Sequence, residues 1–286
     1  MNQPFSIVIP VYNAAATLPE TLASVAGQSF HGYEVILVDD GSDDDSAEII
    51  KKWLAKHPDN TRVISQANAG LGAARNHGIA EAKNPWIAFL DADDLWHKKK
   101  LEILQKKIHK QPADVHYHAV RSFGLKRTRL RRIFQLNSLK DILIKGNPLI
   151  PSATVVKRTV LQQYPFSENQ QHHGAEDLHL WLRLLHAERN FRCYGDALTD
   201  YRETGGMSTQ LDHHLKQVFS VLEDLQQEGL YGNKILQRAM ERKHFEAGRF
   251  LQKRSYFKEA AQYYKMSDSA LKTKIIALLN RWQLAI

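Results

Sequence analysis

The sequence predicts an α/β protein: a mostly parallel, Rossmann-like sheet flanked by helices, with a helical region appended at the C-terminus. Three observations predict this fold. Short apolar runs rich in β-branched residues recur in the first part of the chain, amphipathic stretches separate them, and polar clusters follow them. Runs that are apolar throughout are typical of strands buried on both faces. Strands that alternate with helices imply right-handed crossovers and a ligand site at the carboxyl ends of the strands.

The first part of the chain alternates strands and helices. A helix begins at Thr17 to Glu20, which has the spacing of a capping box, with Pro19 in the first turn. Further helices are expected around 49–54 and 73–82. The predicted strands are Phe5–Val11, Tyr33–Val38, Arg62–Ser65 and Trp86–Leu90.

From about residue 113 the pattern loosens, and it ends in two strand-like runs at 191–194 and 198–201. We expect one α/β domain over 1–209, with a first half at about 1–110 and a second half at about 111–209. Beyond Gly206 the apolar spacing is helical until Gly229. Stretches 239–251 and 256–265 predict a helical hairpin, so 210–286 is expected to be a helical C-terminal region.

Composition limits the cellular setting. The net charge of +8 suits anionic partners. No apolar run approaches the ~20 residues that span a bilayer, and the N-terminus lacks the pattern of an export signal. The single cysteine, Cys193, excludes an internal disulfide. We therefore expect a cytoplasmic protein, with peripheral contact to the cytoplasmic face of the inner membrane as an option.

The strongest chemical signal is Asp91-Ala92-Asp93-Asp94, directly after the apolar run that ends at Leu90. Carboxylates gathered at a strand end suit a hard divalent cation, which prefers oxygen ligands and also binds diphosphate. The alternative is an acidic turn that caps the segment from Leu95.

Two further polar clusters follow strands. Asp39-Asp40-Gly41-Ser42 offers carboxylates to a base or ribose, and its Gly-Ser turn lets backbone approach a ligand. Asn68 through Asn76 combines small residues with Arg75, which can reach phosphate or base. Each cluster alone also fits an ordinary strand-to-helix turn.

In this order the motifs resemble the inverting glycosyltransferases of family 2, which have the GT-A fold. The resemblance covers about residues 5–110 and resumes at Gly174 to Asp177 and at Tyr201-Arg202. The matching segments are Ile9 to Asn13, Val38 to Ser42, Asn68 to Asn76 and Phe89 to Asp94.

The resemblance implies that the half at about 1–110 binds a nucleotide-sugar donor together with a metal, and that the half at about 111–209 binds the acceptor. It implies that Asp93 holds Mn²⁺ or Mg²⁺ against the donor diphosphate, with Asp91 and Asp94 assisting. Pro10, Tyr12, Asp40 and Arg75 would line the nucleoside pocket. The full set of expected substrate-binding residues is Pro10, Tyr12, Asn13, Asp39, Asp40, Arg75, Asp91, Ala92 and Arg202.

The resemblance also implies a catalytic base. The acidic pair Glu176-Asp177 heads an apolar helix pattern, and we expect Asp177 to take the proton of the acceptor hydroxyl, with Glu176 as its neighbour. A plain acidic helix start is the alternative. Arg202 would stabilise the leaving diphosphate. Family members often carry a histidine shortly after that arginine, whereas here Glu203 to Ser208 contain none.

The sequence thus predicts transfer of a sugar from a nucleotide-diphosphate donor, a UDP-sugar in the first instance, to a hydroxyl of a glycan or lipid-linked acceptor. Cell-envelope polysaccharide or lipopolysaccharide synthesis is the expected setting. A sugar-nucleotide nucleotidyltransferase is an alternative, although no glycine-rich loop follows the first strand. A non-catalytic glycosyltransferase-like binding protein is another. Nucleic acid is not expected as a partner, because the acidic strand ends would repel a polyanion.

Two basic features suggest membrane contact. Residues 121–132 hold six basic side chains and no acid, and the segment 271–286 has an apolar face with lysines nearby. A solvated loop and a packed helix explain them equally well. The pairs His172-His173 and His213-His214 lack a recognised ligand spacing, so we assign them no metal.

Overall fold

The structure, a computed structural model, confirms the α/β fold. It describes residues 4–124, 128–131, 133–203, 211–252 and 255–267. The strands are β1 (Phe5–Val11), β2 (Tyr33–Asp39), β3 (Thr61–Ser65), β4 (Trp86–Phe89), β5 (Leu95–Trp96), β6 (Val115–Phe123), β7 (Arg129–Leu130), β8 (Thr154–Lys157) and β9 (Phe191–Arg202). The helices are α1 (Leu18–Ala26), α2 (Ser46–Lys56), α3 (Leu71–Glu81), α4 (Lys100–Lys110), α5 (Leu139–Lys145), α6 (Arg158–Gln163), α7 (Glu176–His186), α8 (Leu211–Gln227), α9 (Asn233–Gln252) and α10 (Phe257–Lys265), with short 3-10 turns η1 (Pro151–Ala153) and η2 (Gln170–His172).

The strands form one sheet in the order β3-β2-β1-β4-β8-β6-β9-β5, with β7 paired to β6. The first four strands along the chain are parallel neighbours, as predicted. β8 lies antiparallel between β4 and β6, while β6 and β9 run parallel. The two predicted runs at 191–194 and 198–201 are one strand, β9, whose pairing with β6 is irregular near Ala119.

Both faces of the sheet are covered, which explains why the first strands are apolar throughout. Along β1, Val8 joins the core beneath α3 and α7, whereas Ile7 and Ile9 join the core beneath α1, α2 and α4. All three side chains are fully buried. Because successive residues of a strand point to opposite faces, a strand between two helical layers needs apolar residues at every position.

The predicted capping box at α1 does not form. Thr17 is the N-cap residue and Pro19 lies in the first turn, but the Thr17 side chain makes no capping hydrogen bond. Its hydroxyl donates to the carbonyl of Ala92, and Glu20 binds Arg202. The two side chains are used in tertiary contacts, so the prediction was right about the helix start and wrong about the cap.

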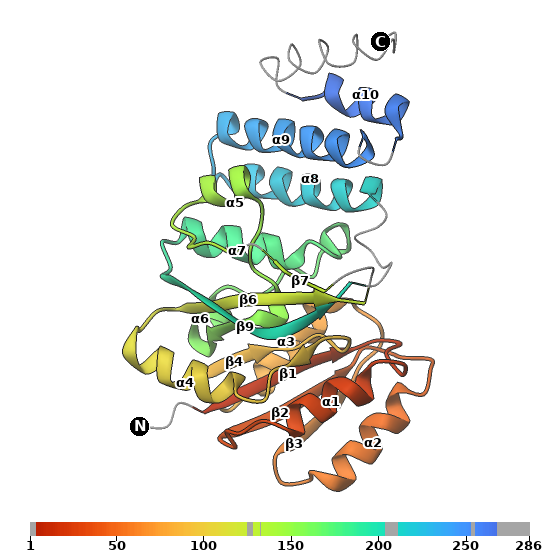
Figure 1. The fold of residues 1–286 in the computed structure, drawn as a ribbon, viewed down its shortest axis with the longest axis vertical. Helices are drawn as coiled ribbons and strands as arrows, with labels where there is room; N and C mark the ends of the chain where they lie inside the picture. The colour runs from red at the N-terminus through yellow and green to blue at the C-terminus, as the bar shows by residue number, and fades with distance from the viewer. Residues whose placement is uncertain (1–3, 125–127, 132, 204–210, 253–254, 268–286) are drawn as a thin grey trace.

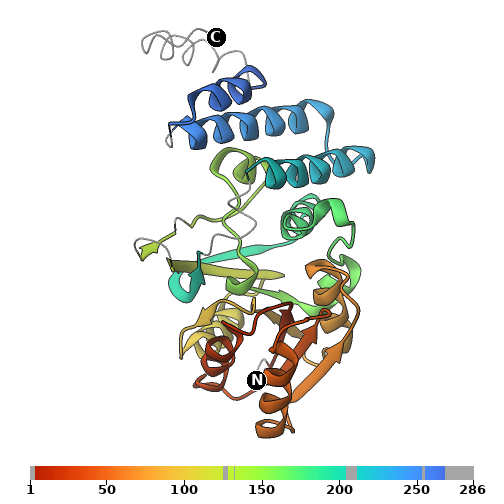
Figure 2. The same cartoon turned by 90° about the vertical axis from the view of Figure 1, so that its right-hand side faces the viewer.

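The C-terminal helices stack beyond α7, on the side of the molecule away from β1 to β3 (Figures 1 and 2). Val221 and Leu225 of α8 share a hydrophobic core with Trp181 of α7. α9 and α10 form the predicted hairpin, in which Tyr264 packs against Phe245. α9 begins at Asn233, before the predicted 239. The basic stretch is described only in part, and segment 271–286 lies outside the described residues.

Among the described residues, no helix is both long enough and apolar enough to cross a membrane.

We predict that Gly72→Ala destabilises the fold. A methyl group at residue 72 would lie 2.1 Å from the backbone carbonyl oxygen of Ser167, which cannot move without shifting the chain. Overpacking of this kind costs about 1–3 kcal/mol, measured as a lower midpoint of urea unfolding. The matched control is Gly232→Ala, where nothing lies within 4 Å. Equal midpoints for the two variants would contradict the prediction.

Candidate active site

The loop before α3 is held by Asp40, at the end of β2. The Asp40 carboxylate accepts hydrogen bonds from the Gln66 side chain at 2.8 Å, from Ala69 N at 2.8 Å and from Gly70 N at 2.9 Å. Gly70 has φ +91°, a left-handed conformation that favours glycine, and α3 begins at the next residue. Asp40 is almost fully buried, so it fixes where α3 starts.

A neighbouring turn presents Tyr12. Asn13 has φ +48°, and its side chain accepts a hydrogen bond from Asp43 N at 2.9 Å, while Asn13 N donates to the Ser42 hydroxyl at 3.1 Å. Asp39 is buried and accepts from Ser42 N at 3.1 Å. Pro10 lies buried within β1, and Tyr12 remains half exposed. The turns after β1 and β2 are therefore tied together, with an aromatic ring at their surface.

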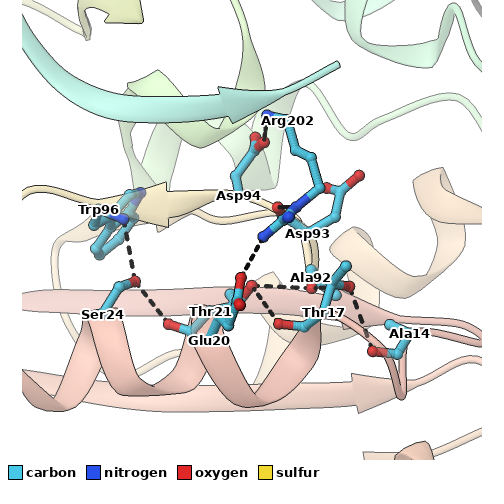
Figure 3. Close-up of polar contacts among 10 residues, drawn as sticks. All are labelled: Ala14, Thr17, Glu20, Thr21, Ser24, Ala92, Asp93, Asp94, Trp96 and Arg202. Carbon is cyan, nitrogen blue, oxygen red and sulfur yellow. Dashed lines mark hydrogen bonds and ion pairs between the residues drawn. The ribbon is translucent and has the colours of Figure 1, made fainter. Parts of the chain in front are cut away.

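The acidic loop after β4 is anchored through its backbone. Thr17 and Thr21, one turn apart on α1, both donate to the Ala92 carbonyl, at 2.9 and 3.0 Å (Figure 3). Asp91 N donates to the Ser152 hydroxyl at 2.9 Å. These contacts fix the loop without using the side chain of Asp93.

Arg202, at the end of β9, contacts the same loop. Its backbone N donates to Asp94 Oδ1 at 2.8 Å, and its Nε donates to the Asp93 carbonyl at 2.8 Å (Figure 3). The Arg202 guanidinium forms an ion pair with Glu20 at 2.6 Å and lies over the Phe123 ring. The structure thus brings Arg202 to the acidic loop, although more than a hundred residues separate them.

The acidic loop carries more negative charge than its surroundings neutralise. Burial, and then the charge of Asp91, raise the pKa of Asp93 to about 6. Burial and the charges of Asp91 and Asp93 raise the pKa of Asp94 well above its usual value. Asp94 Oδ2 is buried and has no hydrogen-bond partner among the described residues. A divalent cation would supply the missing positive charge and oxygen contacts, so these residues fit one.

Lys100 is a buried lysine near the loop, a position that sequence reasoning did not predict. It is fully buried, donates to the Ser152 carbonyl and to the Thr199 hydroxyl, and lies over the Trp96 ring at 3.9 Å. Burial lowers its pKa well below the usual value, while the charge of Asp94 opposes that shift. Within the run Lys98-Lys99-Lys100 nothing distinguishes the third lysine from a surface residue.

Arg75 of α3 lies between two carboxylates. Its side chain is only 2% exposed, and it donates to Asp91 at 2.8 Å and to Glu176 at 2.7 Å. Burial opposes its charge, but these carboxylates outweigh burial and raise its pKa. Phe166 lies against the guanidinium. Arg75 thus connects the end of β4 to the start of α7, and its expected contact with the nucleoside stays a prediction.

The acidic pair at the start of α7 divides into two roles. Glu176 is buried, and besides Arg75 it accepts a hydrogen bond from Gly174 N at 2.6 Å. Asp177 is partly exposed, and its carboxylate accepts a hydrogen bond from the adjacent Leu178 N. Burial and the charge of Glu176 raise the pKa of Asp177 to about 7, against the effect of Arg75. Asp177 thus has a carboxylate of raised pKa that does not share the ion pair between Glu176 and Arg75.

The predicted residues therefore fall into two linked groups. Asp40 and the turn of Tyr12 and Asn13 lie at the ends of β1 and β2. The acidic loop, Arg202 and the start of α7 form the second group, joined to the first through α3 and Arg75. The contributors that sequence reasoning missed are Thr17, Glu20, Thr21, Lys100 and Ser152.

The family model and two relatives that match this chain are described as glycosyltransferases. The family model "Glycosyl transferase family 2" matches residues 6–165. A Rickettsia felis protein named "Uncharacterized glycosyltransferase" is 30% identical over 210 residues, covering 72% of this chain and 34% of the relative. A Bacillus subtilis protein named "Putative glycosyltransferase EpsE" is 30% identical over 208 residues, covering 69% of this chain and 72% of the relative.

The B. subtilis "Minor teichoic acid biosynthesis protein GgaB" is 27% identical over 73% of this chain and 24% of its own length. This chain spans about a third of the R. felis relative and about a quarter of GgaB.

Solved structures share the fold. Staphylococcus aureus TarS 1-349 in complex with UDP-GlcNAc has a TM-score of 0.66 at 19% identity, covering 93% of this chain and 82% of that one. The mannosyltransferase PcManGT from Pyrobaculum calidifontis, in complex with GDP-Man and Mn²⁺, has a TM-score of 0.65 at 17% identity, covering 100% and 81%. The similar folds extend over the C-terminal helices as well as the sheet.

We predict that Arg75→Met costs about 3–5 kcal/mol in the free energy of unfolding, because it leaves Asp91 and Glu176 charged and unpaired beside an apolar side chain. Guanidinium unfolding measures the loss. The matched control is Arg62→Met, which removes a more exposed pair with Glu81 and should cost no more than ~1 kcal/mol. If both variants unfold at the same denaturant concentration, Arg75 does not hold the site together.

Proposed function

This chain belongs to glycosyl transferase family 2, and we propose that it is an inverting, metal-dependent enzyme that moves a sugar from a UDP-sugar to an acceptor hydroxyl. The observation that carries the proposal is the difference between the contacts of Glu176 and those of Asp177 at the start of α7. Glu176 is fixed by Arg75, whereas Asp177 retains a carboxylate of raised pKa, joined through Arg75 to the acidic loop. That arrangement suits a base beside a donor site.

The donor is proposed from chemistry and from relatives together. The similar TarS and PcManGT structures are complexes with UDP-GlcNAc and GDP-Man, both nucleotide-diphosphate sugars. In this chain the half-exposed Tyr12 offers a surface on which a nucleobase can stack, and Asn13 and Asp39 flank it. We propose a uridine nucleotide, the kind bound in the TarS complex.

The metal site is proposed at the acidic loop, with Mn²⁺ or Mg²⁺ held by Asp93 and assisted by Asp91 and Asp94. A bound ion would neutralise the donor diphosphate and stabilise it as it leaves. Arg202 lies beside this loop and adds positive charge there. The Asp91 carboxylate is shared with Arg75, which leaves Asp93 and the unpartnered Asp94 Oδ2 as the oxygens not engaged in the fold.

The proton is assigned to Asp177. As the acceptor oxygen forms its bond to the anomeric carbon, its O–H bond breaks and the proton passes to the Asp177 carboxylate. The bond from the anomeric carbon to the diphosphate breaks at the same centre, and its electron pair stays on the diphosphate oxygen. Attack opposite the leaving group inverts the anomeric configuration.

The acceptor is proposed to be a glycan or a lipid-linked carrier used in cell-envelope polysaccharide synthesis, at an anionic membrane surface. The name of GgaB, a teichoic acid biosynthesis protein, and the net charge of +8 support this setting. Within the described part of the basic stretch, Arg121 pairs with Asp200 and Arg129 with Glu203. These pairs reduce the free positive charge there, so membrane contact rests on the overall charge.

Removal of the metal ligand tests the donor site. We predict that uridine diphosphate binds the protein more tightly with Mn²⁺ than with EDTA, and that Asp93→Ala abolishes the difference because the diphosphate loses its counter-charge. Isothermal titration calorimetry measures both affinities. Asp59→Ala, an exposed acidic residue far along the chain from the loop, is the control and should behave as the parent protein. Equal affinity in Mn²⁺ and EDTA for the parent protein would refute the metal role.

Replacement of the base tests the chemistry. We predict that Asp177→Asn keeps donor binding and folding while kcat falls by ~10²-fold or more, because a positioned proton acceptor is lost. Glu176→Gln is the matched comparison: it weakens the pair with Arg75, so it should lower the unfolding midpoint, which Asp177→Asn should not. An α-linked donor should give a β-linked product by NMR.

Turnover near that of the parent protein in Asp177→Asn would assign the base elsewhere. Donor binding without any transfer in the parent protein, across a panel of glycan acceptors, would favour the non-catalytic binding protein. Formation of a sugar nucleotide from a sugar phosphate and a nucleoside triphosphate would favour the nucleotidyltransferase.

A further inference from the structure

A second group of ligand-type side chains lies apart from the acidic loop, where α8 packs on η2 and α7. His172 ends η2, His179 lies one turn into α7, and Asp224 comes from α8. One ligand atom from each of the three lies within 4.8 Å of the others. The Asp224 carboxylate is 3.3 Å from His179 Nε2 and 4.0 Å from His172 Nε2.

The two imidazoles are buried, and three of their four ring nitrogens lack a well-formed hydrogen bond among the described residues. The His172 and His179 side chains are 1% and 3% exposed. His172 Nε2 and both ring nitrogens of His179 have no geometrically acceptable hydrogen bond among the described residues. An unpaired buried polar atom costs free energy, so a native cluster of three needs a partner.

A neighbouring hydroxyl orients the His172 ring. The Ser167 hydroxyl lies 2.8 Å from His172 Nδ1, which turns Nε2 of that ring toward Asp224. In many metal sites, the ring nitrogen of a histidine ligand that does not bind the metal forms a hydrogen bond of this kind, which fixes the orientation of the ring.

We propose that His172, His179 and Asp224 form a second metal site, for a transition-metal ion such as Zn²⁺. Zn²⁺ bound to nitrogen and oxygen at its usual bond lengths separates tetrahedral ligand atoms by about 3.3 Å. The contact from Asp224 to His179 already has that length, and small rotations of His172 would close the rest. Asp224 is 36% exposed, which leaves an approach for the ion and room for a water as fourth ligand.

The ligand set separates this site from the acidic loop. Imidazole nitrogens favour Zn²⁺ and its neighbours in the transition series, whereas carboxylate oxygens favour Mg²⁺ and Mn²⁺. The site would join α8 to α7, whose first turn carries Glu176 and Asp177. A bound ion would therefore pin the C-terminal helices to the helix that bears the proposed base.

The test uses the full-length chain without a polyhistidine tag, treated with a chelator and then titrated with Co²⁺ in excess Mg²⁺. We expect one Co²⁺ per chain with the visible absorption of a tetrahedral centre, and a rise in Tm with Zn²⁺. His179→Ala and Asp224→Asn should each weaken binding by at least about tenfold and lose the rise in Tm. Asp224 is partly exposed, so its variant tests the site even where His179→Ala fails to fold.

Two controls make the result specific. His31→Ala removes an exposed histidine and should leave Co²⁺ binding unchanged, whereas a loss there would indicate surface binding and overturn the site. Asp93→Ala should also keep the Co²⁺ absorption, because the acidic loop is not involved. Absence of the tetrahedral absorption, or equal affinity in Asp224→Asn and the parent protein, would show that the cluster is only a histidine–aspartate contact. None of these readouts depends on sugar transfer, so the outcome is separate from that of the proposed function.

Discussion

The buried guanidinium of Arg75 is the constraint on which the site depends. A cation with 2% exposure is tolerated only where opposite charges meet it, and Asp91 and Glu176 do so from different sides. One residue lies after β4 and the other begins α7, while Arg75 itself lies on α3. Because each carboxylate would lose its ion pair without the arginine, the two pairs favour the observed packing of these three elements. The position of Asp177 follows from it, since Asp177 is the next residue along α7.

A second consequence is that structural and chemical roles are assigned to neighbouring residues. Backbone groups hold the acidic loop: Ala92 and Asp93 through their carbonyls, and Asp91 through its N–H. The Asp93 carboxylate stays available beside them. The same separation appears at α7, where Glu176 binds Arg75, whereas Asp177 accepts a hydrogen bond from its neighbour Leu178 N. A fold that immobilises a loop by its main chain can leave side chains free for a ligand without losing rigidity.

The C-terminal helices belong to this arrangement and are not a loose addition. Val221 and Leu225 of α8 extend the core of Trp181, on the helix that starts with the acidic pair. Packing of apolar side chains already fixes α8 against α7, and Asp224 faces two buried histidines across that contact. The helices α8 to α10 therefore bear on the placement of the proposed base, although they contribute no side chain to it.

The sequence by itself determined the sheet-forming runs of β1 to β4 and the loops at their carboxyl ends. Strand patterns and turn motifs are local, and the topology of a parallel sheet places those ends on one edge. The tertiary structure alone decided that Arg75 binds carboxylates, that Glu176 and Asp177 differ, that Lys100 is buried, and that His172 meets Asp224. Each of these depends on contacts between residues far apart in the chain. Neighbours in sequence cannot reveal such contacts, because burial and charge pairing are properties of the packed interior.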